Sequence, residues 1–128
     1  MTATKAKRVK KKILVVEDNR VTLRMLERTL SDAGYAVIPA SDGREAVRMA
    51  KLRRPDLLIL DIVLPGLDGI GVACSLRDDP TTEGIPIIFL SALLGKTKGQ
   101  EIKPIEGTSF IGKPWKKDEL LKEVAHYL

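Results

Sequence analysis

The chain has 128 residues, of which 44% are hydrophobic, 30% charged and 4% aromatic, a size and balance typical of one soluble globular domain. Its single cysteine, Cys74, excludes an intrachain disulfide and a cluster of thiolate metal ligands. No apolar run approaches the roughly 20 residues that cross a bilayer, and no apolar stretch follows the basic N-terminus as in a signal peptide. We therefore expect no membrane partner and a cytoplasmic location.

The positive charge is concentrated at the N-terminus. The net charge is +5, and six of the first twelve residues are lysine or arginine, so removing them leaves −1 for the rest of the chain. We expect residues 1–11 to form a basic, flexible, solvated tail and residues 12–128 to form the folded domain. Because aromatic side chains that stack on bases are scarce, we expect no nucleic-acid binding by this domain.

Apolar runs and helical patterns alternate along the chain. Short continuous apolar runs indicate strands buried on both faces, and they lie at 13–16, 35–38, 56–60, 86–90 and 109–111. Apolar residues spaced three and four apart indicate amphipathic helices, and they lie at 20–33, at 42–52, after Asp68 and at 117–128. Either Ser41 or Asp42 can cap the second helix, Gly34 is suited to end the first, and we expect Cys74 in the core.

The stretch 92–108 interrupts this alternation because it contains several glycines and a proline, which are poor helix formers. We expect at most a short, loose helix near 96–103, so the fourth helix of the series is weak or irregular. The alternating order of strands and helices predicts an α/β fold, with a five-stranded parallel sheet covered by helices on both faces.

Polar side chains follow the expected strands at the point where each strand ends: Glu17 and Asp18, Asp61, Ser91, and Lys113. Because ligands bind at the carboxyl ends of the strands in an open parallel sheet, we expect these groups to converge on one edge. A buried carboxylate such as Asp61 is costly unless it is paired or binds a metal. Clustered carboxylate oxygens suit Mg²⁺, with Mn²⁺ as a second possibility.

Four motifs in order carry a resemblance to a known family: "LVVED" at 14–18, "LLILDIVLPGLDG" at 57–69, "PIIFLSA" at 86–92 and "FIGKPW" at 110–115. Together they make the chain similar to the receiver domain of two-component response regulators, of the stand-alone chemotaxis-like type, over about residues 12–128. The resemblance implies the flavodoxin-like doubly wound sheet with strand order 2-1-3-4-5.

The resemblance also implies roles for the polar residues at the strand ends. Asp61 would be the phosphoacceptor that takes a phosphoryl group from a kinase histidine. Glu17, Asp18, Asp61 and the backbone carbonyl of Val63 would hold Mg²⁺. Ser91 would hydrogen-bond to the phosphoryl group and Lys113 would pair with it, which agrees with the need of phosphoryl transfer for positioning and charge neutralisation. The Lys-Pro bond of the family is usually cis.

The resemblance further implies a conformational switch and residues that set the lifetime of the phosphorylated state. Ser91 and Phe110 would form the switch, although Phe110 lacks the hydroxyl group that is common at this position, and the 92–128 face would change its binding to partners. Val63 and Leu93 flank the path of the hydrolytic water in the family, and both are apolar. We therefore expect the protein to catalyse its own Mg²⁺-dependent phosphorylation and only slow dephosphorylation, without a dedicated enzymatic output.

The expected partners are a histidine kinase or phosphotransfer protein and a downstream protein of unknown identity, with the chain a monomer or weak dimer. Three other interpretations stay open. The chain could be a receiver fragment of a larger transcriptional regulator. It could be a hydrolase of the aspartyl-phosphate type, although such enzymes usually need a second aspartate at the position of Val63. It could also be a flavodoxin-like binding protein, although no phosphate-cradling loop follows the first strand.

Overall fold

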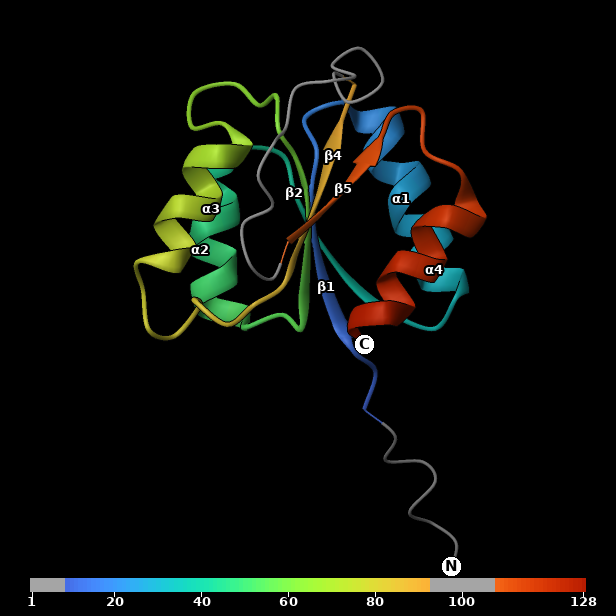
Figure 1. The fold of residues 1–128 in the computed structure, drawn as a ribbon, viewed down its shortest axis with the longest axis horizontal. Helices are drawn as coiled ribbons and strands as arrows, with labels where there is room; N and C mark the ends of the chain where they lie inside the picture. The colour runs from blue at the N-terminus through green and yellow to red at the C-terminus, as the bar shows by residue number, and fades with distance from the viewer. Residues whose placement is uncertain (1–8, 93–107) are drawn as a thin grey trace, which may run out of the picture.

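The protein is described by a computed structural model, which places residues 9–92 and 108–128 (Figure 1). Its centre is a five-stranded sheet in the order β2-β1-β3-β4-β5, in which every neighbouring pair is parallel. The strands are β1 (Lys12–Val16), β2 (Ala36–Ala40), β3 (Leu57–Asp61), β4 (Ile87–Ser91) and β5 (Thr108–Gly112). The predicted fold class and strand order are confirmed.

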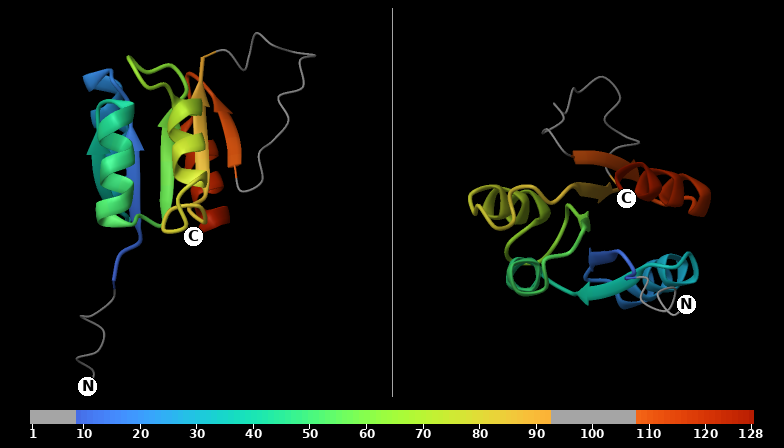
Figure 2. Two further views of the ribbon diagram at one scale, coloured as in Figure 1. Left: turned by 90° about the vertical axis from the view of Figure 1, so that its left-hand side faces the viewer. Right: turned by 90° about the horizontal axis from the view of Figure 1, so that it is seen from below.

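Helices cover both faces of the sheet, with α1 and α4 on one side and α2 and α3 on the other (Figures 1 and 2). They are α1 (Arg20–Asp32), α2 (Gly43–Arg53), α3 (Gly69–Arg77) and α4 (Lys117–Tyr127). The loose helix predicted near 96–103 lies outside the described residues, and so does most of the predicted basic tail. No helix among the described residues is long and apolar enough to span a membrane.

The starts of three helices are fixed by side chains that the sequence supplies at the N-cap. The side chains of Asn19, Asp42 and Asp68 accept hydrogen bonds from backbone N–H groups in the first turns of α1, α2 and α3. Asp42, rather than Ser41, therefore caps α2. Gly34 follows α1 with a φ of 100°, the left-handed conformation that glycine adopts without steric cost.

The core consists of two apolar layers, one on each face of the sheet. The central strands β1, β3 and β4 are buried along their length except for Lys12 at the start of β1, and alternate apolar residues of each strand point to opposite layers. Leu14 and Val16 pack toward α2 and α3, whereas Ile13 and Val15 pack toward α1 and α4. At one edge, β2 contains the exposed Pro39.

The prediction that Cys74 lies in the core is wrong, because Cys74 is exposed on α3. The buried residues of this helix are Gly69, Val72, Ala73 and Leu76, which share one face. Cys74 lies about 100° around the helix from Ala73, and this rotation takes its side chain off the buried face.

Candidate functional site

The polar residues predicted at the strand ends lie together at one edge of the sheet. Asp61 is the last residue of β3 and Ser91 the last of β4, while Glu17 directly follows β1 and Lys113 directly follows β5. Three of these groups are almost inaccessible to solvent: Glu17 is 1% exposed, Ser91 2% and Asp61 5%. Four strands therefore bring charged and hydroxyl groups into one small buried region.

Lys113 joins two of these carboxylates. Its Nζ lies 2.6 Å from Glu17 Oε1 and 2.9 Å from Asp61 Oδ2. The backbone of Lys113 is also fixed, since its N–H donates to the Ser91 carbonyl at 3.0 Å and its bond to Pro114 is cis, as the family resemblance implied. The lysine thus links the ends of β1, β3, β4 and β5.

The remaining carboxylate oxygens accept hydrogen bonds from the backbone. Val63 N–H donates to Asp61 Oδ1 at 3.1 Å, and Asn19 N–H donates to Glu17 Oε2 at 3.1 Å. The two buried carboxylates are therefore each paired with an ammonium and with a backbone donor, which offsets the cost of removing them from water. The sequence analysis did not identify the Asn19 backbone N–H as a donor to Glu17, because residue type does not mark a backbone contact. It also missed the Asn19 side chain as the N-cap of α1, although an asparagine just before a helical pattern is a typical N-cap signal.

Burial and charge act on the pKa values of the pair in opposite ways. Burial raises the pKa of Glu17, and the nearby negative charge of Asp61 adds to this rise, while the hydrogen bond from Lys113 opposes it. Burial alone would lower the pKa of Lys113, but its hydrogen bonds to Glu17 and Asp61 outweigh burial and raise it. Lys113 therefore carries its positive charge at neutral pH.

Three carboxylates at this edge are arranged as metal ligands could be. Glu17, Asp18 and Asp61 each offer an oxygen, and these oxygens all lie within 4.8 Å of one another. Asp18 is exposed, so the cluster is reachable from solvent on that side. A set of hard oxygen donors with one open side fits Mg²⁺, which keeps several waters and takes few protein carboxylates.

A glycine sets the distance between this site and α3. A Cβ atom on Gly69 would lie 2.4 Å from the Asp61 carbonyl oxygen and 2.7 Å from Cα of Ile62. The N–H of Gly69 donates to the Ile62 carbonyl at 2.9 Å. The first residue of α3 therefore packs directly on the backbone at the end of β3, and it fixes the loop that carries Val63.

Of the other predicted site residues, Val63 lies beside this edge and Phe110 lies in the middle of β5. Leu93 is outside the described residues. Val63 is 62% exposed, so much of its side chain is in contact with solvent beside Asp61. Phe110 is half-buried, and its ring stacks on Phe89 with 5.1 Å between the ring centroids.

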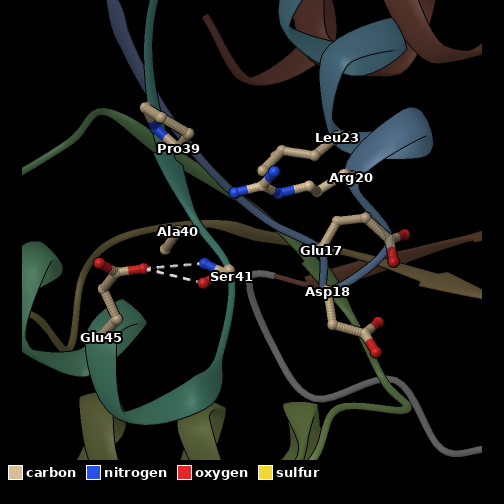
Figure 3. A pocket seen from close by; sticks show the side chains of 8 residues that line it. All are labelled: Glu17, Asp18, Arg20, Leu23, Pro39, Ala40, Ser41 and Glu45. Atoms are coloured by element: carbon tan, nitrogen blue, oxygen red, sulfur yellow. Dashed lines mark hydrogen bonds between the residues drawn. The ribbon is translucent and has the colours of Figure 1, made fainter.

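Two cavities flank the site. The first, of about 290 Å³, lies between the start of α1 and the end of β2, and Figure 3 shows the side chains that line it, with the Arg20 guanidinium extending away from the carboxylates of Glu17 and Asp18. On its far side Glu45 accepts hydrogen bonds from Ser41. The second cavity, of about 390 Å³, is largely apolar and is lined by Thr22, Met25, Ala92, Lys113, Pro114 and Trp115.

Comparison with known proteins gives a consistent picture. Residues 13–125 match the family described as the response regulator receiver domain. The chain is 41% identical over 105 residues to the response regulator PleD of Caulobacter vibrioides, covering 80% of this chain but only 23% of PleD. It is 30% identical over 118 residues to the polar-differentiation response regulator DivK of Brucella anthropi, covering 92% of this chain and 96% of DivK.

A solved structure with the same fold is the receiver domain of the sensor histidine kinase PA1611 of Pseudomonas aeruginosa, which was obtained with a magnesium ion coordinated in its active site cleft. The TM-score is 0.80 and the sequence identity 32%, and the match covers 93% of this chain and 98% of the other.

Proposed function

Because the chain belongs to the response regulator receiver domain family, we propose that it is a signalling module in which Asp61 accepts a phosphoryl group from the histidine of a kinase or phosphotransfer protein. One observation carries this proposal: Asp61 ends β3 within 2.9 Å of Lys113 Nζ and shares a cluster of carboxylate oxygens with Glu17 and Asp18. A nucleophilic carboxylate, a fixed cation and a set of metal ligands are the parts that phosphoryl transfer needs.

In this reaction a carboxylate oxygen of Asp61 forms a bond to phosphorus while the phosphorus–nitrogen bond of the phosphohistidine breaks. The nitrogen leaves with the electron pair of that bond, and Asp61 becomes an acyl phosphate. Lys113 would neutralise one phosphoryl oxygen, and the Ser91 hydroxyl would hydrogen-bond to another. Lys113 Nζ already lies 2.9 Å from Asp61 Oδ2, so little reorganisation is required of this group.

We assign Glu17, Asp18, Asp61 and the backbone carbonyl of Val63 as the groups that would hold Mg²⁺ directly or through water. When bound, Mg²⁺ would neutralise charge on the transferred group and on the acidic cluster. Asp61 itself orients its carboxylate through the hydrogen bond that it accepts from Val63 N–H. The chemistry of the donors supports this assignment, because all are hard oxygens.

Phosphorylation would then act on partners through the 92–128 face. As Ser91 moves toward the phosphoryl group, Phe110 would be drawn into the space that Ser91 leaves. Because Phe110 is already half-buried, its fuller burial would stabilise the new arrangement by part of the roughly 1.5–3 kcal/mol that complete burial of a Phe side chain contributes. Phe110 already stacks on Phe89 and lies one strand away from Ser91, which supports this role. The partner that we propose is defined only by its class: it is a protein that binds this face when Asp61 is phosphorylated.

The deciding experiment is to incubate the protein with Mg²⁺ and phosphoramidate and to measure its mass. We expect one added phosphoryl group, which is absent in Asp61→Asn. Asp78→Asn is a matched control, because Asp78 is an exposed aspartate at the C-cap of α3, away from the site. Equal labelling of Asp61→Asn and the wild type would rule out Asp61 as the acceptor.

A further inference from the structure

Three polar side chains join β5 to the last two turns of α4. The Ser109 hydroxyl donates to Glu123 Oε2 at 2.7 Å and is also hydrogen-bonded to the Tyr127 hydroxyl. A serine hydroxyl has a single hydrogen, and here it is given to Glu123, so Tyr127 must donate to Ser109. We call this directed chain, from Tyr127 through Ser109 to Glu123, the Ser109 clamp.

The clamp and Lys113 lie at opposite ends of one unit. β5 runs from Thr108 to Gly112, Lys113 follows in the turn, and α4 then runs back beside β5 from Lys117 to Tyr127 (Figure 1). The turn between strand and helix therefore holds Lys113, and the clamp closes the open end of the unit. Lys113 directly follows the last residue of β5, so the position of its backbone depends on where β5 lies.

β5 needs such a tether because it is an edge strand of the described sheet, hydrogen-bonded to β4 alone. Apolar packing also holds it, since Ile111 belongs to the same buried cluster as Leu120 and Val124 of α4. The driving force for burying apolar surface has no preferred direction, so this packing alone specifies the position of the helix along the strand less sharply than directed contacts do. Hydrogen bonds depend strongly on distance and angle, and the clamp therefore fixes the register of α4 on β5.

We propose that Ser109, held by Tyr127 and Glu123, is a positioning residue for Lys113. The clamp prevents the start of β5 from separating, and it thereby keeps the Lys113 ammonium between Glu17 and Asp61. The neighbouring residue, Phe110, points to the opposite face of the sheet and stacks on Phe89, so the start of β5 is fixed on both faces. The effect of the clamp on phosphorylation rests on the proposed function, but its effect on the position of Lys113 does not.

The test uses two measurements on folded protein. The first is the NMR shift of the Lys113 backbone amide, which donates to the Ser91 carbonyl. The second is the rate of phosphorylation by phosphoramidate at saturating Mg²⁺. Ser109→Ala removes both hydrogen bonds of the clamp and should move the amide shift and slow phosphorylation about fivefold, less than the hundredfold that a full misplacement of about 1 Å can cost.

Two further variants check the cause. Tyr127→Phe removes one hydrogen bond and should give a smaller change in the same direction, and it keeps the test valid if Ser109→Ala does not fold. Ser109→Thr retains a hydroxyl and suits a strand, so it should restore both measurements to near the wild-type values.

Thr82→Val is the matched control. The Thr82 hydroxyl is buried and donates to the Leu76 carbonyl at 2.8 Å, beyond the end of α3 and away from Lys113. This variant should lose stability without moving the Lys113 amide or the phosphorylation rate.

If Ser109→Ala behaves like Thr82→Val, the clamp is purely structural and the inference is wrong. If the wild type takes up no phosphoryl group, the proposed function fails, and the Lys113 amide shift alone then decides whether the clamp positions Lys113.

Discussion

Lys113 Nζ lies 2.6 Å from Glu17 Oε1, although the two residues are 96 positions apart in the sequence. The same ammonium lies 2.9 Å from Asp61, so it stands between two carboxylates that would otherwise repel each other in a buried place. The phosphoacceptor site that we propose is thus organised around a cation before any metal or phosphoryl group arrives.

Replacing Lys113 by methionine should destabilise the fold, because it leaves two buried carboxylates without their cation. We expect a loss of about 1–3 kcal/mol in the free energy of unfolding, measured by urea denaturation without divalent ions. Lys51→Met is a matched control, since Lys51 makes an exposed ion pair with Asp79 at 3.5 Å, and such pairs contribute little. Equal stability of the two variants would contradict the importance of the Lys113 bridge.

Mg²⁺ should stabilise the protein by binding the three clustered carboxylates. Ligand at a hundred times its dissociation constant adds about 2.7 kcal/mol to the free energy of unfolding. Binding can be followed by the fluorescence of Trp115, which lines a cavity together with Lys113. The double variant Asp18→Ala, Asp61→Ala should lose the response, while Asp32→Asn at the exposed end of α1 should keep it. A response that survives the double variant would place the metal elsewhere.

Gly69→Ala should destabilise the protein, because the new methyl group would lie 2.4 Å from the Asp61 carbonyl oxygen. Overpacking of this kind costs about 1–3 kcal/mol, and we expect the chemical shifts of Asp61 and Ile62 to change as well. Gly84→Ala serves as the control, because its Cβ atom would meet no other atom within 4 Å. Similar urea midpoints for both variants would show that α3 can move away from β3 at little cost.

Asp79 should give the fold a pH-dependent stabilisation. Its pKa lies below the ordinary value of 3.8, chiefly because the Thr81 backbone N–H donates to it, with further help from the Thr81 hydroxyl and Lys51. Because the pKa is lower in the folded state, the contribution is present above the unfolded pKa and is lost as the pH falls through the folded pKa. The stability advantage of the wild type over Asp79→Asn should therefore shrink in acid, and Thr81→Ala should weaken this trend. A difference in the free energy of unfolding between the wild type and Asp79→Asn that stays constant with pH would contradict this role of Asp79.

Val63 should slow hydrolysis of phospho-Asp61, because its exposed apolar side chain cannot orient an attacking water. We expect Val63→Asn to shorten the lifetime of the labelled protein severalfold, measured as loss of label in Mg²⁺. Ile70→Asn, another exposed apolar residue nearby, should leave the lifetime unchanged. Unchanged decay in Val63→Asn would show that water reaches the acyl phosphate by a different path. The companion expectation for Leu93 is tested with Leu93→Glu in the same assay.

The strand-end positions of Glu17, Asp61, Ser91 and Lys113 could be predicted because they follow from topology. Once five strands are known to run parallel, the residues after them must meet at one edge. The Ser109 clamp could not be predicted in this way. Its members lie 14 and 18 residues apart, and their contact depends on the register of a helix on a strand, which no local pattern encodes.

Cys74 shows a different limit of the sequence analysis. Its expected burial followed from the usual preference of cysteine for the core, whereas its position on α3 is set by helical phase. Val72, Ala73 and Leu76 occupy the buried face, and Cys74 lies off it. Helical periodicity was the better guide here, because the direction of a side chain on a regular helix follows from geometry and not from residue type.

Pro39 limits the backbone hydrogen bonds that the outer edge of β2 can make. The Ala36 N–H donates to the Lys11 carbonyl and the Ala40 carbonyl accepts from the Glu17 N–H, so residues 36, 38 and 40 face β1. Position 39 faces outward, and there proline supplies a ring in place of an N–H group. A β-strand of another molecule that paired with this edge of β2 would find no N–H donor at Pro39, midway along the contact. The sheet therefore resists edge-to-edge growth into fibrils on this side.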